Sequence, residues 1–328
     1  MIKLSICVIA HNEEQFLPGL LENIRKQTYP HHFIEVVLVD GMSVDKTKKL
    51  MKKFSEDNKD FYSIQVLDNP KKIQAAGWNV AITHATGDVI SRIDAHAVLP
   101  KEFSALVVKD ISEGEDIVGG IRRCIIERNS AYGKLLLAAE NSAFGSSINK
   151  SRRGKERSYV KTMFHASYKK EVFQKVGLFN ESLIRTEDNE MHYRIRKAGY
   201  KLCYDPEIVS YQYARSSLQH MLKQKFGNGY WIGITLKVCP GCISLYHLVP
   251  MAFVCGIILT GILEKIGVWQ LGTIMWLLYG LFAVFNTIIS GINEGFTVYS
   301  PLMPILFLLI HINYGVGTIL GVLRNNSL

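Results

Sequence analysis

The sequence predicts an α/β domain with a mostly parallel central sheet, followed by a C-terminal helical membrane region of about three spans. Two observations support this fold class. In the first hundred residues, short apolar runs alternate with segments of helical spacing, which is typical of an open sheet covered by helices. After residue 240 the chain is apolar, and its charged residues there are Glu264, Lys265, Glu294 and Arg324.

The charge distribution excludes a simple soluble globular protein. The formal net charge is +9, and all of it lies in the first 240 residues because the remainder carries equal numbers of acidic and basic residues. A basic domain next to apolar segments is expected at the cytoplasmic face of a membrane. Basic charge alone would also fit a nucleic-acid reader, but no reading motif supports that class. We therefore expect anionic lipid as a partner and no nucleic acid.

The first hundred residues predict a strand-helix alternation. Residues 4–10 and 35–39 are apolar runs typical of parallel strands buried on both faces. Residues 13–27 between them have helical spacing, with Asn12 as candidate N-cap and Pro18 near the first turn. The alternation continues with a helix at 44–54, a strand at 64–67, a helix at 73–83 and a strand at 89–93. In such sheets ligands bind beyond the carboxyl ends of the strands.

Polar residues follow three of these strands directly, at 11–13, 40–45 and 94–96. We expect them to converge on one crevice. Further along the chain, residues 143–159 predict a loop that carries the basic run Lys150 to Arg157. A helix is expected from Glu187 to Ala198, with Thr186 as N-cap and Gly199 as its left-handed end. Residues 216–232 resemble an interfacial amphipathic helix with aromatic anchors.

Three uncharged stretches are long enough to cross a bilayer, at about 243–263, 268–289 and 299–322. A very apolar helical core is the alternative interpretation. Three full spans would place the C-terminus outside, but Pro301 and Pro304 leave open a re-entrant third segment. The domains expected are therefore 1–215 for catalysis, 216–240 for the interfacial segment and 241–328 for the membrane helices.

The six cysteines predict no disulfide framework. Only Cys239 and Cys242 form a C-x-x-C pair, and one pair without further ligands is a weak metal signal. The first ten residues have neither the length nor the cleavage site of a secretory signal. We therefore expect reduced cysteines at a membrane boundary and a catalytic domain in the cytoplasm.

Four motifs, at residues 5–14, 39–47, 92–97 and 186–190, occur in an order that is specific although each motif alone is weak. Together they resemble a family 2 glycosyltransferase of the GT-A fold, in particular the succinoglycan-biosynthesis ExoA-like subgroup. The resemblance covers residues 1 to about 232 and implies a Rossmann-like nucleotide-sugar-binding domain. A nicotinamide dehydrogenase is disfavoured, because no G-x-G-x-x-G follows the first strand.

The resemblance implies donor-binding roles for one set of residues, namely Ala10, Asn12, Glu13, Asp40, Asp45, Gln74, Asn79 and Asp94. Asp40 ends a strand and is expected to contact the nucleobase or ribose, as the equivalent aspartate does in the family. Structural alternatives remain open: a turn former for Asp40, a helix cap for Asp45, and capping of the first helix by Asn12 and Glu13.

Asp94-Ala95-His96 corresponds to the Asp-X-Asp motif of the family, which binds the ribose and a divalent metal. Alternation along an extended segment would place Asp94 and His96 on the same side, where both could bind one ion. Imidazole with carboxylate suits Mn²⁺ better than Mg²⁺, so we expect a divalent metal with Mn²⁺ favoured. The alternative for His96 is a histidine that only forms hydrogen bonds.

Glu187-Asp188 matches the motif whose aspartate is the general base of inverting members, so Asp188 is the expected catalytic residue. A helix N-terminus would lower the pKa of Asp188 and make it a weak base, whereas the neighbouring Glu187 and burial would raise that pKa. A charged first turn without a catalytic part is the structural alternative. The expected acceptor-side residues are His165, Glu187, Gln224 and Trp231.

The sequence therefore predicts an inverting, metal-dependent glycosyltransferase. It would move a sugar from a nucleotide donor, favoured as UDP-linked, to a lipid-linked saccharide in exopolysaccharide or capsule assembly at the cytoplasmic membrane. Transfer to a polyprenyl phosphate is the alternative within the enzyme class. A catalytically silent membrane-bound scaffold subunit is the alternative of another class. Other polysaccharide-assembly proteins are further candidate partners.

Overall fold

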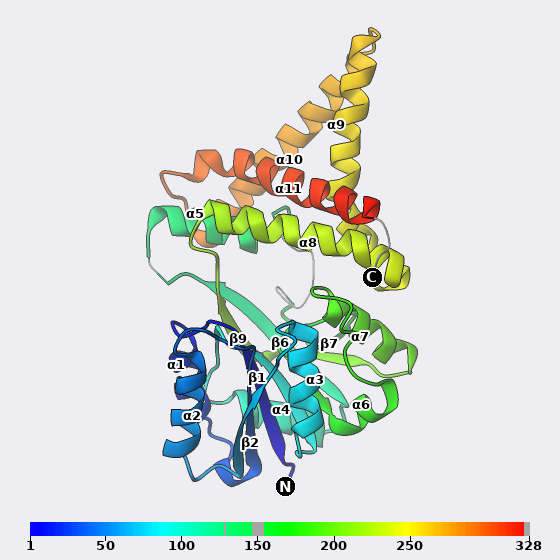
Figure 1. Cartoon of the computed structure of the whole chain (residues 1–328). Coiled ribbons are helices and arrows are strands. Elements are labelled where there is room, and N and C mark those ends of the chain that lie inside the picture. Colours follow the sequence, from blue (N-terminus) through cyan, green and yellow to red (C-terminus); the bar gives the residue numbers. More distant parts are fainter. Residues whose placement is uncertain (128, 146–153, 325–328) are drawn as a thin grey trace. The chain divides into compact units, whose positions relative to one another are not determined.

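Figure 1 shows a computed structural model of the chain, which describes residues 1–127, 129–145 and 154–324. Its contacts divide the chain into two compact units. The first contains residues 1–123 and 150–212, and the second contains residues 124–149 and 213–328. The segment 124–149 thus groups with the apolar C-terminal helices, although nothing in its own composition indicates this.

The first unit is built around a sheet that covers both halves of its sequence. Its strands are β1 (Leu4–Ala10), β2 (Ile34–Asp40), β3 (Ser63–Asp68), β4 (Val89–Asp94), β5 (Ala97–Val98), β6 (Ile117–Ile125), β7 (Ser158–Val160), β8 (Ser167–Lys169) and β9 (Leu202–Tyr213). Its helices are α1 (Leu17–Arg25), α2 (Thr47–Asp57), α3 (Gln74–His84), α4 (Phe103–Ser112), α6 (Lys170–Val176) and α7 (Glu187–Lys197).

The strand order is β3-β2-β1-β4-β8-β6-β9-β5, with β7 paired to β9. The four strands β3, β2, β1 and β4 are parallel, as the sequence predicts for the first hundred residues. Beyond β4 the pairs are antiparallel, from β4–β8 and β6–β8 to β5–β9 and β7–β9. The sheet is therefore mixed, with its parallel half at the N-terminal part of the chain.

The parallel strands are buried on both faces because helices pack on each side (Figure 1). One core contains Ile6 and Val8 of β1 with apolar side chains of α1, α2 and α4. The other contains Cys7 of β1 with side chains of α3, α6 and α7, including the fully buried Trp78. Alternate residues of one strand thus enter different cores, as expected for an apolar run without polar alternation.

One predicted helix cap is wrong, and the other is confirmed in position only. Helix α1 begins at Leu17 after Phe16, and Asn12 lies in the preceding loop with a φ of 56°. Thr186 does precede α7, but its φ is 68° and its side chain makes no capping hydrogen bond. The predicted left-handed residue Gly199 is confirmed, with a φ of 93°.

A buried carboxylate lies at the amino end of the parallel strands. Glu35, the second residue of β2, is fully buried and accepts hydrogen bonds from Ser5 Oγ at 2.5 Å and Thr86 N at 2.7 Å. The hydroxyls of Thr86 and Ser63 and the amide of Gln65 also donate to it. Burial opposes ionisation of Glu35, but these hydrogen bonds outweigh it and lower the pKa.

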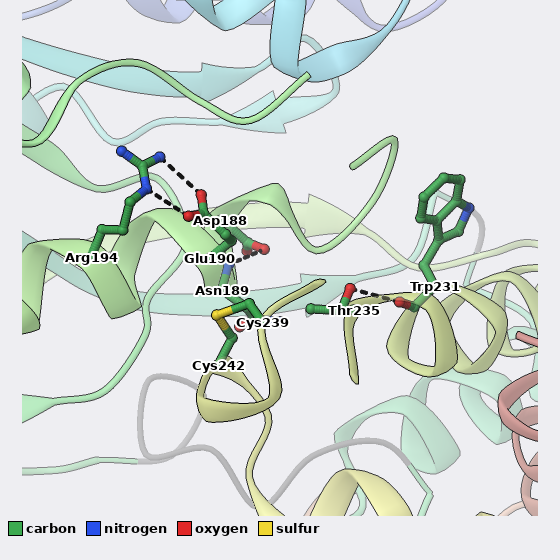
Figure 2. Close-up of a disulfide and its surroundings, with 8 residues drawn as sticks. All are labelled: Asp188, Asn189, Glu190, Arg194, Trp231, Thr235, Cys239 and Cys242. Atoms are coloured by element: carbon green, nitrogen blue, oxygen red, sulfur yellow. Dashed lines mark hydrogen bonds and ion pairs between the residues drawn. A yellow bond between two sulfur atoms is a disulfide. The ribbon is translucent and has the colours of Figure 1, made fainter. Parts of the chain in front are cut away.

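The second unit is helical, with α5 (Ala131–Asn141), α8 (Leu218–Val238), α9 (Val249–Lys265), α10 (Gln270–Glu294) and α11 (Met303–Leu323). Among the residues that the structure describes, three helical segments are long and apolar enough to cross a membrane: Leu245–Lys265, Gln270–Glu294 and Ser300–Leu323. At the end of α8, Cys239 and Cys242 form a disulfide, which Figure 2 shows. The expectation that both cysteines are reduced is therefore wrong for this structure.

Candidate active site

The loops after β1 and β2 are held together by hydrogen bonds. Asn12 Oδ1 accepts from Val44 N at 2.9 Å, and Asn12 N donates to Ser43 Oγ. Asp45 Oδ2 accepts from the backbone of Glu14, and its Oδ1 accepts from Thr47 N. Asn12 and Asp45 therefore shape the two loops, which is compatible with both the structural and the donor-binding interpretations.

Asp40, the last residue of β2, is 1% exposed and accepts from Ser43 N with both carboxylate oxygens at 3.2 Å. Asp40 pairs with Ala10, the last residue of the neighbouring strand β1, and the Ala10 carbonyl accepts from Gly41 N. Asn69 lies next to it and donates its backbone N–H to the Asp40 carbonyl. In the described part of the chain no donor reaches the buried Oδ1 of Asn69. The sequence analysis did not single out this amide.

Asp94 ends β4, and its carboxylate lies 3.3 Å from Nε2 of His165. Burial opposes ionisation of Asp94, but His165 outweighs it with support from His96 and Arg92, so the pKa of Asp94 lies well below its usual range. Burial in turn lowers the pKa of His165. The structure thus brings together Asp94 and His165, which the sequence assigned separately to the donor and acceptor sides.

His96 does not share the direction of Asp94 by strand alternation, because the chain turns at Ala95 and His96 before β5 begins. The expected extended geometry is therefore wrong. His96 Nδ1 lies 3.3 Å from Oε1 of Glu13, and its Nε2 accepts from the amide of Gln212 at 2.5 Å. These partners place the ring proton on Nδ1.

The donor set fits a divalent cation at Asp94 but only partly at His96. Asp94 offers an ionised carboxylate that is 24% exposed. Both nitrogens of His96 are hydrogen-bonded, so its Nε2 would have to leave Gln212 to bind an ion. Among residues 1–127, 129–145 and 154–324, no group of three or more His, Cys, Asp or Glu side chains forms a ready-made cage. A cation here would need oxygen ligands from a bound substrate.

The first turn of α7 carries two adjacent carboxylates. Glu187 is 4% exposed, and burial together with the neighbouring Asp188 raises its pKa. Burial also raises the pKa of Asp188, although the guanidinium of Arg92 opposes that shift. Figure 2 shows Asp188 Oδ1 accepting from Asn189 N and, one turn on, the ion pair between Glu190 and Arg194. This turn therefore holds carboxylates that bind protons more readily than usual.

Arg92 is a buried cation that the sequence analysis quoted in a motif without assigning it a role. Its guanidinium lies between two aromatic rings, 4.5 Å from the centroid of Trp78 and 4.4 Å from that of Phe179. It also lies 3.9 Å from Oε1 of Glu187. An arginine inside a buried strand could have revealed this site, because a buried charge requires a partner.

Asn79 fixes one of those rings. Its amide group donates to Phe179 O and to Glu181 Oε1, both at 3.0 Å, and its Oδ1 accepts from Phe179 N. Both amide protons are thus used within the domain, so Asn79 is less suited to hold a nucleotide than the sequence suggested. Gln74 is exposed at the first turn of α3 and remains a candidate for donor contact.

Backbone strain gathers around the same edge. The described non-glycine residues with positive φ are Asn12, Met42, Lys72, His165 and Thr186. The first three follow β1, β2 and β3, His165 contacts Asp94, and Thr186 precedes the carboxylates of α7. Such conformations cost about 1–3 kcal/mol each and persist where the surrounding structure enforces them, often at functional sites.

The contacts described so far do not test the predicted acceptor-side residues of the second unit or the basic run. Gln224 and Trp231 lie on α8 in the second unit, where the Trp231 carbonyl accepts from Thr235 Oγ1 (Figure 2). In the basic run, Lys150, Arg152 and Arg153 lie outside the described residues. Arg157 is described and forms ion pairs with Glu113 and Glu115.

The comparison with protein families identifies one match. The model described as "Glycosyl transferase family 2" matches residues 5–177, which is more than half of the chain. The matched segment contains β1 to β8 and ends before α7. It therefore covers Asp40 and Asp94 but not Asp188.

Two curated relatives extend over most of the chain. One is the succinoglycan biosynthesis protein ExoA of Rhizobium meliloti (strain 1021), 29% identical, with 82% of this chain and 84% of the relative covered. The other is a dolichyl N-acetyl-alpha-D-glucosaminyl phosphate 3-beta-D-2,3-diacetamido-2,3-dideoxy-beta-D-glucuronosyltransferase of Methanococcus voltae. It is 28% identical and covers 99% of this chain and 98% of its own length. These relatives bear out the expected ExoA-like resemblance.

A solved structure shares the fold. The mannosyltransferase PcManGT from Pyrobaculum calidifontis, in complex with GDP-Man and Mn²⁺, aligns with a TM-score of 0.63 at 18% identity. The alignment covers 97% of this chain and 87% of that one. At this identity the likeness shows the predicted GT-A fold alone.

Proposed function

Because the chain belongs to glycosyl transferase family 2 and is a glycosyltransferase, we propose that it is an inverting, metal-dependent enzyme. It transfers a sugar from a nucleotide donor, favoured as UDP-linked, to a lipid-linked saccharide in exopolysaccharide or capsule assembly. The observation that carries this proposal is a set of acidic residues: Asp40 and Asp94 at the carboxyl ends of β2 and β4, and Glu187-Asp188 at the start of α7.

The donor would bind along the loops after β1 and β2. Asp40 ends β2 at this edge of the sheet, and this position supports a role in contacting the base or ribose. Asn12 and Asp45 hold these loops in the strained conformation that such a pocket needs. Glu13 is partly exposed beside His96 and completes the polar edge.

A divalent cation, with Mn²⁺ favoured, would be held by Asp94 and by diphosphate oxygens of the donor, with His96 as a further ligand if Gln212 releases it. Its chemistry would be neutralisation of the charge that develops on the diphosphate leaving group. Asp94 supports this role because it stays ionised beside His165. The Mn²⁺ found with the Pyrobaculum calidifontis mannosyltransferase agrees with the proposal.

Asp188 would act as the general base. Its raised pKa gives a carboxylate that accepts a proton more readily than an exposed aspartate, which suits base catalysis near neutral pH. The acceptor hydroxyl gives its proton to Asp188 and forms a bond to the anomeric carbon. The bond from that carbon to the diphosphate oxygen breaks, and the nucleoside diphosphate leaves with the electron pair. Attack opposite the leaving group inverts the anomeric centre without a covalent intermediate.

A polyprenyl phosphate acceptor is the second candidate. The undecaprenyl-phosphate 4-deoxy-4-formamido-L-arabinose transferase of Salmonella newport (strain SL254) is 32% identical over 125 residues, although it covers only 37% of each chain. A silent scaffold subunit is disfavoured, because Asp40, Asp94 and Asp188 are all present and the buried cation Arg92 lies close to the last two. We place the enzyme at the cytoplasmic membrane, with residues 1–215 as its catalytic domain facing the cytoplasm.

A panel of nucleotide sugars tests this function. The detergent-solubilised full chain would be incubated with each donor in Mn²⁺, Mg²⁺ or EDTA, and release of nucleoside diphosphate would be measured with and without lipid-linked acceptors. We expect one donor to turn over, with loss of turnover in EDTA and inverted stereochemistry in the product. A folded protein that binds and hydrolyses none of the donors would contradict the enzyme assignment.

A further inference from the structure

Helices α8 and α11 of the second unit lie side by side along their whole lengths (Figure 1). Their backbones touch at glycines: a Cβ on Gly229 would lie 2.0 Å from Tyr314 O, and one on Gly321 would lie 2.0 Å from Tyr230 O. At the far end, Lys237 Nζ donates to Arg324 O. Because residue numbers rise together along both helices, the two run in the same direction.

The polar middle of α8 excludes it from the hydrocarbon. Each helix has 21 residues, about 31 Å, which equals the thickness of the hydrocarbon layer. If α11 crossed the bilayer, the paired α8 would cross with it. Exposed Lys223 and the neighbouring Gln224, Lys225 and Asn228 would then lie inside the hydrocarbon, at most about 7.5 Å from its centre. A lysine at the centre costs about 2.5–3.5 kcal/mol on insertion scales.

If α11 and α8 crossed the bilayer, helix α5 would have to enter the hydrocarbon with them. Lys225 forms a buried ion pair with Glu140 of α5 at 2.7 Å. Helix α5 also carries Lys134, so a spanning α11 would bring a further charge below the headgroups. This ion pair joins α5 to α8, which is itself packed along α11.

The other two apolar helices are far less covered by protein, although α10 meets α5 near its C-terminal end, where Asn141 donates to Glu294. In each of Leu245–Lys265 and Gln270–Glu294, protein buries 6% of the most apolar 18-residue stretch. In Ser300–Leu323 it buries 39% of the corresponding stretch. Apolar side chains of α9 and α10 are exposed along the helices, including Ile258, Leu277 and Phe285. Helices α9 and α10 therefore present a surface suited to lipid chains, whereas much of α11 is already covered by protein.

We propose that α8 and α11 form one paired surface in the lipid headgroup region and that the α9–α10 hairpin alone crosses the hydrocarbon. Lys223 and Lys237 then face anionic headgroups, and Tyr230 and Trp231 lie at the depth that aromatic anchors favour. The C-terminal end of α11 then lies on the side of the catalytic domain, in contrast to three full spans. This inference rests on the proposed membrane attachment but not on the transfer reaction.

Cysteine labelling in sealed vesicles tests the inference. Ile305→Cys and Leu320→Cys are exposed positions 15 residues apart on α11, and Ile266→Cys lies at the turn between α9 and α10. Each would be introduced into a full-length chain whose native cysteines are replaced by serine and whose fold is checked by circular dichroism. A membrane-impermeant maleimide would be applied from either side, with Lys52→Cys, an exposed position of the catalytic domain, as the reference for sidedness.

We expect the Ile305→Cys and Leu320→Cys variants to react from the catalytic side alone, and the Ile266→Cys variant to react from the opposite side. Reaction of the two α11 positions from opposite sides would overturn the paired surface and leave the proposed function intact. Reaction of Ile266→Cys from the catalytic side would show that the hairpin does not cross, which would overturn both this inference and the proposed multi-pass attachment. Transferase activity measured on the same vesicles reports separately on the reaction.

Discussion

Glu35 and Glu187 are both buried carboxylates of the first unit, but they have different surroundings. Glu35, at the amino end of the parallel strands, accepts hydrogen bonds from Ser5, Ser63, Gln65 and Thr86. Glu187, at the start of α7, has a second carboxylate beside it and a guanidinium 3.9 Å away. Their pKa values accordingly shift in opposite directions, downward for Glu35 and upward for Glu187.

This difference indicates which end of the sheet contributes most to stability. A buried carboxylate with many donors stabilises the folded state, whereas two adjacent buried carboxylates with one cation destabilise it. Strained backbone conformations gather at the same end as Glu187. Functional sites often retain such costs, because the chemistry needs groups with perturbed pKa values. We therefore expect replacements at the carboxyl end of the strands to change activity and replacements at the amino end to change stability.

The largest expected effect is on donor binding at the carboxyl end. Asp94→Asn removes the ionised carboxylate proposed to bind the cation, while keeping the side-chain size beside His165. We expect donor affinity to fall about 100-fold, or about 2.8 kcal/mol, together with the metal dependence. Isothermal titration with the nucleoside diphosphate in Mn²⁺ and in EDTA measures this. Unchanged, metal-dependent affinity would remove Asp94 from the cation site.

The next effect concerns the cation between the two aromatic rings. Arg92→Met keeps the apolar contacts with Trp78 and Phe179 but removes the charge beside the α7 carboxylates. We expect kcat to fall about 100-fold, because a small misplacement of a catalytic group has effects of that size. KM for the donor should change little, and Arg92→Lys should recover part of kcat. Equal losses in kcat and in stability, without rescue by lysine, would indicate a purely structural role.

A smaller effect, on stability alone, is expected at the amino end. Glu35→Gln keeps the shape of the side chain but weakens the hydrogen bonds from Ser5 and Thr86. We expect the folded state to lose about 2 kcal/mol, with kcat unchanged at temperatures where the variant is folded. Chemical unfolding followed by tryptophan fluorescence measures the first quantity. A loss of kcat in the folded variant would show that the two ends are coupled.

The smallest effect is a gain in stability. The folded state raises the pKa of Glu187 to about 8, so stability is complete at acidic pH and is lost as the pH rises toward that value. Glu187→Gln should therefore be about 1 kcal/mol more stable than the wild type at pH 8, and equal to it near pH 4. Glu35→Gln should show the reverse, because a lowered pKa contributes stability that disappears as the pH falls. Unfolding curves across this pH range compare the two variants directly.

Most of the parallel half of the first unit was predictable from the sequence. Strands such as residues 4–10 are continuous apolar runs, and the helices between them have clear spacing, so local pattern and burial agree. The polar ends of these strands then indicated Asp40 and Asp94. The order of the antiparallel strands was not predictable, because β8 pairs with β4 and β6 across long stretches of chain.

The errors arose where contacts distant in sequence determine the local structure. Asn12 has the chemistry of a helix cap, but its side chain bonds to Val44 instead. His96 turns away from strand alternation and meets Glu13 and Gln212. The aromatic environment of Arg92 combines α3, β4 and the segment before α7, so no local pattern reveals it.

Asp188→Asn provides the most direct test of the central claim, which is that the carboxyl end of the sheet performs sugar transfer. Donor binding and donor turnover would be measured on the same preparations of wild type, Asp188→Asn and the amino-end control Glu35→Gln. The proposed mechanism predicts that Asp188→Asn keeps the donor affinity of the wild type but loses a factor of about 10²–10⁴ in kcat, while Glu35→Gln keeps both. An Asp188→Asn variant that turns over the donor at the wild-type rate would contradict the assignment of the general base.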